Sequence, residues 1–335
     1  MNRLIHVKFF LRHPYPCFHS IENVFKQIVD SLPGSITTEK YNLKKKEKGI
    51  FNRIFSLIDV YLNRGFINHI TGHVTYIVLA LPKNRTIVTF HDLESIDRRS
   101  KLKTWLLILF WVKIPAKKCK IITTISEHTR DEIIRITGVK PEKVKVIYDP
   151  LPNGLIYTPK EFCSAKPNIL VVGTKINKNL EGVVAAVKGI SCRLTIIGKL
   201  SEIQVKLLND NSIEYKNLFN ISYDTIIDTY KRCDILCFSS FYEGFGMPII
   251  EAQAIGRPVI TSNYGAMKEV ADDAALFVDP AKVEQISKAI ITLIYDRKLR
   301  DSLIQKGLEN IKRFEAKVIA EQYAELYKRI AADRL

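Results

Sequence analysis

Two carboxylates, Glu243 and Glu251, flank a glycine-rich turn in the second half of the chain. The turn follows an apolar run at residues 234–240 that ends in small polar residues, as a buried parallel strand does at its carboxyl end. Gly244 and Gly246 allow backbone close to a ligand, and Pro248 suits a first helical position, where its missing N–H costs nothing. The pattern predicts a strand, a turn and then a helix over residues 249–255.

A helix that starts at the carboxyl end of a parallel strand offers free N–H groups and its positive dipole end to a phosphate or sugar oxygen. Glu243 would lie on the loop, whereas Glu251 would lie on a helix whose other residues look buried. A carboxylate in such surroundings needs hydrogen-bond donors, and ribose hydroxyls would serve. The alternative is a glycine-rich turn with Glu251 facing solvent. Gly256 as a cap and a following strand at residues 257–262 favour the ligand site.

The segment from Glu243 onward resembles the E-G-F-G-x-P-x-x-E-A-x-x-x-G-x-P-V motif of retaining GT-B glycosyltransferases, in the large family often called family four. The resemblance covers nearly the whole chain and is strongest from about residue 168 onward. It implies that Glu243 contacts the donor sugar and that Glu251 holds the ribose. It also implies that sugar and pyrophosphate face the backbone of Gly244, Phe245 and Gly246.

A second part of the site follows the apolar run at residues 169–172. Gly173 would end this strand and Lys178 would start the next helix, facing the cleft. The segment resembles the family's K-N element, whose lysine neutralises the diphosphate as the leaving group gains charge. Thr174 stands where many relatives have arginine, so Lys175 would have to supply a second phosphate cation. The alternative for Lys178 is an ordinary solvated lysine in a first helical turn.

In the first half of the chain, His91 follows a short apolar run and would lie at the carboxyl end of a strand. It resembles the family's H-D or H-T position, where a histidine lies near the transferred sugar. A neutral imidazole there could hydrogen-bond a sugar hydroxyl or carbonyl; the alternative is a structural histidine at a strand end. Residues 12–22 carry prolines where many relatives have a glycine pair, and we expect acceptor contacts from them.

No metal ion or other cofactor is expected. The sequence has no D-x-D, the element that binds a metal-chelated diphosphate in the other major glycosyltransferase fold. His69 and His73 have the spacing of a metal pair, but Gly72 interrupts the helix that would align them and no third ligand stands out. Charge neutralisation would therefore depend on Lys178 and the helix N-terminus.

Apolar runs alternate with helical stretches in both halves, which predicts an α/β fold. The resemblance makes this GT-B, two Rossmann-like doubly wound parallel-sheet domains facing a central cleft. The expected strands are residues 5–10, 74–79, 86–90, 121–125 and 144–148, then 169–172, 194–197, 235–238, 259–261 and 276–278. A proline-rich linker at residues 149–159 separates an acceptor domain, residues 1–157, from a nucleotide-sugar domain, residues 158–315. A last helix, at about residues 316–335, would pack back on the first domain.

The chain of 335 residues has a net charge of +16, and residues 1–160 carry +14 of it, from 27 Lys and Arg against 13 Asp and Glu. A field of one sign indicates an anionic partner, although it could also be a solubility device. Residues 98–113 join a basic segment to an apolar stretch containing Trp105 and Trp111. Its helix would lie in an anionic membrane interface or be buried against the first sheet.

These observations predict a retaining, metal-independent glycosyltransferase. It would move a hexose from a UDP- or GDP-linked sugar to a hydroxyl of a glycan acceptor, lipid-linked and destined for lipopolysaccharide, O-antigen or capsule. The alternative is a non-catalytic protein that binds a sugar nucleotide or polyanion on the same scaffold. Nucleic acid is not expected, because only basicity supports it. Six cysteines without a C-x-x-C pair indicate a reducing compartment, so we expect a cytoplasmic protein, at the inner face of the membrane.

Overall fold

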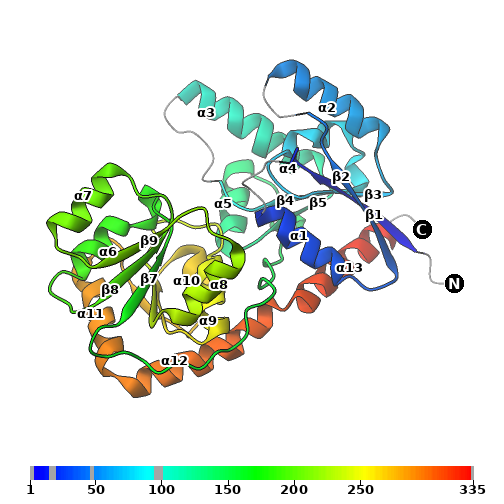
Figure 1. Cartoon of the computed structure of the whole chain (residues 1–335). Coiled ribbons are helices and arrows are strands. Elements are labelled where there is room, and N and C mark those ends of the chain that lie inside the picture. Colours follow the sequence, from blue (N-terminus) through cyan, green and yellow to red (C-terminus); the bar gives the residue numbers. More distant parts are fainter. Residues whose placement is uncertain (1–3, 15–19, 46–48, 94–100, 333–335) are drawn as a thin grey trace. The chain divides into compact units, whose positions relative to one another are not determined.

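The computed structural model describes residues 4–14, 20–45, 49–93 and 101–332 (Figure 1). The chain divides into two compact units, which we describe separately. Unit 1 comprises Met1–Pro150 and Phe314–Leu335, and unit 2 comprises Leu151–Arg313. The expected acceptor loop, residues 12–22, and the basic segment at residues 98–100 lie partly or wholly outside the described residues.

Unit 1 contains a six-stranded parallel sheet in the order β2-β1-β3-β4-β5-β6. Its central strands are buried on both faces, as the continuous apolar runs predict. The strands are β1 Ile5–Leu11, β2 Ile36–Asn42, β3 Ile67–Ile70, β4 Thr86–Phe90, β5 Ile121–Thr124 and β6 Val144–Val146.

The helices of unit 1 include one that is contributed by the far end of the chain. This helix, α13 (Ala316–Ala332), packs against α1, β1 and β3 (Figure 1). The other α-helices are α1 Ser20–Asp30, α2 Ile50–Leu62, α3 Lys101–Leu107, α4 Ile114–Lys118 and α5 Glu127–Thr137. The shorter turns are the 3₁₀-helices η1 Thr75–Ala80, η2 Lys83–Arg85 and η4 Pro141–Lys143, and the π-helix η3 Ile108–Lys113.

Unit 2 repeats the architecture with a parallel sheet in the order β12-β11-β10-β7-β8-β9. Its strands are β7 Asn168–Val172, β8 Arg193–Ile197, β9 Tyr215–Leu218, β10 Ile235–Phe238, β11 Val259–Ser262 and β12 Leu276–Val278. Its helices are η5 Ile176–Lys178, α6 Leu180–Ala186, α7 Glu202–Asp210, α8 Tyr223–Arg232, α9 Met247–Ile255, α10 Gly265–Ala271, α11 Val283–Tyr295 and α12 Arg297–Asn310, and η6 Ile311–Phe314 leads into unit 1. Two such sheets with flanking helices confirm the predicted fold class.

One expected strand is wrong, because residues 74–79 form the 3₁₀-helix η1 instead. The amides of Ile77 and Leu81 donate to carbonyls three residues earlier, those of Val74 and Val78, at 3.0 and 3.1 Å. Most of the run is buried, and a short, fully apolar run fits a buried helical turn as well as a buried strand. The chain enters it through Gly72 and His73, both with positive φ, which ends the extended conformation of β3.

Three strands, β2, β3 and β9, had no strong signal in the sequence. Strand β2 is the edge strand Ile-Thr-Thr-Glu-Lys-Tyr-Asn, and β9 is the edge strand Tyr-Lys-Asn-Leu, so both are mostly polar. Strand β3 is central but contains Asn68 and His69, both fully buried. Polar residues in these strands hid the apolar pattern on which the prediction relied.

His69 is a core residue of unit 1. Its Nδ1 lies 2.8 Å from the hydroxyl of Tyr327 on α13, and its Nε2 lies 2.7 Å from the hydroxyl of Thr89 on β4. Complete burial lowers the pKa of His69 to about 3, so the ring is neutral at physiological pH. Both ring nitrogens are thus used within the core.

Candidate functional site

The predicted strand, turn and helix of residues 234–255 are present in unit 2. Strand β10 is fully buried, Ser239 and Ser240 follow it, and α9 begins after Gly246. Gly246 has φ 121°, and a Cβ there would lie 3.0 Å from Ile249 Cδ1, so the entry to the helix requires glycine. The helix ends at Gly256, which has the left-handed conformation of a C-cap.

The loop after β10 is tied to the loop after β7, its neighbour in the sheet. The Phe241 amide donates to the Asn177 carbonyl at 2.7 Å, and Asn177 Nδ2 donates to the Tyr242 carbonyl at 3.1 Å. Beside these bonds, Lys178 Nζ donates to Glu243 Oε1 at 2.6 Å. The structure therefore brings together two residues from separate motifs, Lys178 and Glu243, at the carboxyl edge of one sheet.

The path of the Lys178 side chain depends on Gly173. Gly173 has φ 96°, and a Cβ on it would lie 2.8 Å from Lys178 Cγ, so the lysine stem runs directly over the glycine. At its end, Nζ lies 4.9 Å from the centre of the Phe238 ring. Only 20% of the Lys178 side chain and 14% of the Glu243 side chain are exposed. The solvated-lysine alternative is therefore wrong, and Lys178 is a fixed, partly desolvated cation.

Gly173→Ala is expected to impair the site beyond its effect on stability. The new methyl group collides with the Lys178 stem, so Nζ must move and turnover should fall at least about tenfold. The matched control is Gly189→Ala, because Gly189 also has positive φ, 79°, but nothing lies within 4 Å of its added Cβ. Both variants should lose about 1–2 kcal/mol of stability from the strained φ. Equal turnover in the two variants, measured by nucleoside diphosphate release, would contradict this role for Gly173.

Thr174 shapes the turn after β7. Its hydroxyl donates to the Lys199 carbonyl at 2.7 Å, and its carbonyl accepts from Gln204 Nε2 at 2.8 Å. These bonds tie the turn to the loop after β8 and to the first turn of α7. Lys175, the expected substitute cation, has an exposed side chain.

Glu251 lies on α9 among residues that are all buried, and it is itself only 8% exposed. Tyr230 on α8 donates its hydroxyl proton to Glu251 Oε2 at 2.7 Å. Burial raises the pKa of Glu251 to about 7, although the bond from Tyr230 opposes the shift. The solvent-facing alternative for Glu251 is therefore wrong. Further donors to this carboxyl group would favour its ionised form and lower its pKa.

Two residues that hold this site together were not singled out from the sequence. Tyr230 is fully buried, but a tyrosine on an amphipathic helix fits a plain core position equally well. Arg257, which follows the cap of α9, is 4% exposed and donates to backbone carbonyls, among them those of Tyr230, Lys231 and Thr158. One indication of this role is visible in the sequence, the position of Arg257 between the helix cap Gly256 and Pro258, just before a buried strand. A charged side chain at such a place needs hydrogen-bond acceptors inside the protein.

His91 directly follows β4 in unit 1, at the predicted strand end. Its Nε2 donates to the Thr71 carbonyl at 2.9 Å, and its Nδ1 lies 3.8 Å from Asp149 Oδ2. Burial alone would lower the pKa of His91, but the Asp149 carboxylate and the Thr71 carbonyl raise it above its ordinary value. The surroundings thus favour a charged imidazolium, whereas the sequence suggested a neutral ring.

Asp149→Asn is expected to lower the pKa of His91 relative to the parent, because the burial remains and the neighbouring negative charge is gone. Titration of the His91 ring by nitrogen-detected NMR measures this directly. Asp131→Asn, which removes an exposed carboxylate of α5 in the same unit, serves as the control. An unchanged His91 pKa in the Asp149 variant would mean that the carboxylate does not hold the ring.

A metal site is not apparent in residues 4–14, 20–45, 49–93 and 101–332, where no three His, Cys, Asp or Glu side chains come together as ligands. Lys178 supplies a cation at the site. The N-terminus of α9, next to Gly246, adds the positive end of a helix dipole.

Comparison with known sequences identifies relatives for both halves of the chain. Glycosyl transferases group 1 matches residues 160–310, and Glycosyltransferase Family 4 matches residues 60–152. The O-antigen chain mannosyltransferase B of Escherichia coli is 27% identical over 232 residues, which are 62% of this chain and 60% of that protein. The O-antigen chain mannosyltransferase RfbU of Salmonella typhimurium is 29% identical over 227 residues, 64% of this chain and 62% of that protein. The match thus spans about three fifths of each of these relatives.

Solved structures share the fold along the whole chain. The structure of Anabaena Alr3699/HepE in complex with UDP and glucose superposes with a TM-score of 0.76, covering 97% of this chain and 100% of that one, at 15% sequence identity. At that identity the likeness concerns the fold. The families that match residues 60–152 and 160–310 show that this chain belongs to the group 1 glycosyltransferases, as the motif at residues 243–259 predicted.

Proposed function

We propose that the protein is a retaining, metal-independent glycosyltransferase that moves a hexose from a nucleoside-diphosphate sugar to a hydroxyl of a glycan acceptor. The observation that carries the proposal is the Lys178–Glu243 pair, held at the sheet edge beside the N-terminus of α9. A cation, a carboxylate and the N-terminus of a helix at one place suit a diphosphate that bears a sugar.

In this proposal the donor enters with its diphosphate against Lys178, the backbone of Gly244 to Gly246 and the start of α9. Lys178 leaves Glu243 for the diphosphate and stabilises the charge that develops as the glycosidic bond breaks. Glu243, released from the lysine, then accepts hydrogen bonds from the sugar hydroxyls. Glu251 holds the ribose, whose hydroxyls supply donors to a carboxylate that is otherwise bonded to Tyr230.

Retention of configuration is proposed from the family motif, as a front-face reaction. The acceptor hydroxyl attacks on the face from which the diphosphate departs, and a phosphate oxygen takes its proton. This route needs no carboxylate nucleophile, in contrast to retaining glycosidases. His91, in unit 1, is proposed to hydrogen-bond the sugar, for which its ring must exchange the Thr71 carbonyl or Asp149 for a sugar hydroxyl.

The acceptor is proposed to be a lipid-linked glycan in the synthesis of a bacterial surface polysaccharide. The names of two relatives, O-antigen chain mannosyltransferases, support this class of product and make mannose the first sugar to test. None of the described helices is long and apolar enough to cross a bilayer. We place the reaction at the inner face of the cytoplasmic membrane, where such acceptors would be reached from the surface.

A thermal-shift screen tests the proposal. UDP-glucose, UDP-galactose, UDP-N-acetylglucosamine and GDP-mannose are each added in the presence of EDTA. One nucleotide class should raise the melting temperature, because a ligand that binds only the native state stabilises it. No shift with any donor would contradict the proposed site, and a shift that requires a divalent cation would contradict metal independence. Binding without any donor consumption would identify a non-catalytic sugar-nucleotide binder instead.

A further inference from the structure

Helix α2 presents its large apolar side chains to solvent. The exposed fraction reaches 84% for Phe51 and 73% for Leu62, whereas Ser56, Asp59 and Val60 are buried. The exposed residues recur at helical spacing, so they form one face of the helix. They are Ile50, Phe51, Ile54, Phe55, Ile58, Tyr61 and Leu62. A soluble domain normally turns such a face toward its core.

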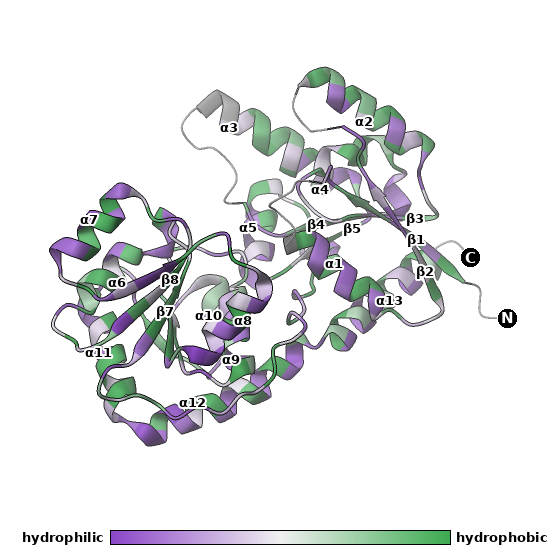
Figure 2. Ribbon diagram, viewed as in Figure 1, coloured by the Kyte–Doolittle hydropathy of each residue, from purple (hydrophilic) through white to green (hydrophobic). Residues whose placement is uncertain are grey.

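A second helical stretch, α3 with η3, also leaves large apolar side chains exposed. Trp105 is 56% exposed, and Leu106 and Phe110 are exposed as well, whereas Val112 lies in the core, so the stretch is buried on one side only. The Arg53 guanidinium of α2 lies 4.6 Å from the centre of the Trp111 ring of η3, which places the two stretches side by side. Figure 2 shows both as mainly hydrophobic. We call these ten side chains the apolar face: the seven of α2 with Trp105, Leu106 and Phe110.

Basic groups border the apolar face in the part of the chain that the structure describes. The one acidic residue of α2, Asp59, is buried, and it accepts hydrogen bonds from Tyr41 at 2.6 Å and Lys44 at 2.8 Å. Residues 101–118 contain five lysines and no Asp or Glu. Basic groups also lie over aromatic rings of α2: Lys45 is 5.7 Å from the Phe55 ring, and Arg64 is 4.2 Å from the Tyr61 ring. An apolar face with a basic border complements an apolar layer with an anionic border.

We propose that the apolar face docks unit 1 onto a bilayer surface that contains anionic phospholipids. The apolar side chains of α2 and η3 enter the boundary between headgroups and acyl chains, and the basic groups pair with lipid phosphates. A second copy of the chain would bring like charges together, which disfavours self-association through this face. The inference deepens the proposed function, since docking would bring the enzyme to a lipid-linked acceptor. Docking itself requires neither donor nor turnover.

The central experiment compares two double variants in co-sedimentation with vesicles. Phe51→Ser with Leu62→Ser removes apolar surface from the face, and Ile203→Ser with Tyr295→Ser removes equally exposed apolar side chains, 80% and 82%, from unit 2. The vesicles are phosphatidylcholine alone, or phosphatidylcholine with phosphatidylglycerol. The parent and the unit 2 variant should bind the anionic vesicles, and the face variant should bind at least about tenfold more weakly. All four residues are exposed, so folding should survive, which circular dichroism checks.

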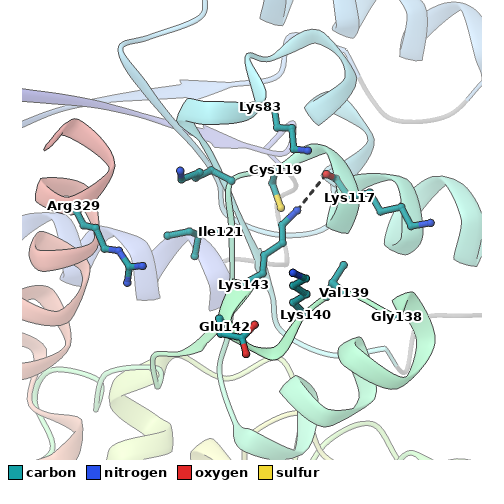
Figure 3. Close-up of a pocket in the computed structure, with 11 residues that line it drawn as sticks. Lys83, Lys117, Cys119, Ile121, Gly138, Val139, Lys140, Glu142, Lys143 and Arg329 are labelled. Atoms are coloured by element: carbon teal, nitrogen blue, oxygen red, sulfur yellow. Dashed lines mark hydrogen bonds between the residues drawn. The ribbon is translucent and has the colours of Figure 1, made fainter. Parts of the chain in front are cut away.

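Unit 1 also offers a control for charge alone. A hollow of about 630 Å³ is lined by basic side chains from η2, α4, η4 and α13, including Lys83, Lys117, Lys140 and Arg329 (Figure 3). Lys83→Ser with Lys140→Ser lowers the net charge while α2 stays intact. This variant should bind anionic vesicles more tightly than the face variant does. Binding by the parent should fall with added salt, because the field of exposed charges reaches only ~8 Å at physiological ionic strength.

Three results would overturn the proposal. The first is equal binding of the parent to neutral and anionic vesicles, or none to either. The second is loss of vesicle binding in the variant with Lys83→Ser and Lys140→Ser while the variant with Phe51→Ser and Leu62→Ser still binds. That result would assign the lipid to the hollow. The third is a concentration-dependent dimer in sedimentation velocity that the face variant abolishes. Donor-induced thermal shifts should be the same in all these variants, so failure of docking is distinguishable from failure of the proposed donor site.

Discussion

Lys178→Ala is expected to lower kcat by about 10²–10³ while donor affinity falls by less. The lysine is held between Gly173, Phe238 and Glu243, so its charge is already positioned before the diphosphate departs. A preorganised cation acts mainly on the charge that develops in the transition state. The measurement is steady-state release of nucleoside diphosphate, with donor affinity determined separately by calorimetry.

Lys188→Ala is the matched control, since it removes an exposed lysine from the same unit. It should leave kcat within a factor of about two, because an exposed charge away from the reacting atoms is screened. If Lys178→Ala retains full turnover, the lysine does not serve the leaving group. If it loses donor affinity while kcat stays unchanged, the lysine acts only in binding.

Glu251→Gln is expected to stabilise the folded protein at high pH and to weaken the binding of the nucleotide-sugar donor. Burial raises the pKa of Glu251 to about 7 in the folded chain, against an ordinary value of 4.5. Below pH 4.5 the carboxyl is protonated in both folded and unfolded chains and costs nothing. As pH rises from 4.5 through 7, the unfolded chain releases the proton first, so the parent loses stability. The loss amounts to at most about 3 kcal/mol above pH 7.

Glutamine keeps the shape of the side chain and can still accept from Tyr230, but it never ionises. Urea unfolding should therefore show a higher free energy of unfolding for the variant than for the parent at pH 8, but not at pH 4.5. Glu161→Gln, an exposed change in the same unit, should show no such pH dependence. Donor binding should weaken by about 1.5–3 kcal/mol, the worth of hydrogen bonds to a charged group. Unchanged donor affinity in a stabilised variant would remove Glu251 from the ribose site.

The fold and the elements of the donor site could be predicted where the conformation of a segment depends on residues next to each other in the sequence. Gly246, Pro248 and Gly256 fix the start and end of α9, so the turn and helix followed from local rules. The same holds for Gly173, which directly follows β7, as expected. Buried central strands such as β4, β7 and β10 also followed from their apolar runs.

Partners distant in sequence could not be predicted in this way. The bond from Tyr230 to Glu251 and the contact of Asp149 with His91 each join residues of different elements, and they set the two pKa shifts of the site. The contact between Lys178 and Glu243 also needed the order of strands in the sheet, because β7 and β10 are neighbours in space only. The exposed face of α2 required knowledge of which side of the helix packs on η1.

The anomeric configuration of the sugar released from its donor tests the central claim most directly. The protein is incubated with the nucleotide sugar that raises its melting temperature, and the free hexose and nucleoside diphosphate are followed by proton NMR before mutarotation. A retaining glycosyltransferase should consume an α-linked donor and release the α-hexose first, and Lys178→Ala should abolish most of the signal. Release of the β-hexose would contradict retention. A folded protein that consumes no donor, with or without a lipid-linked acceptor, would contradict the assignment as a glycosyltransferase.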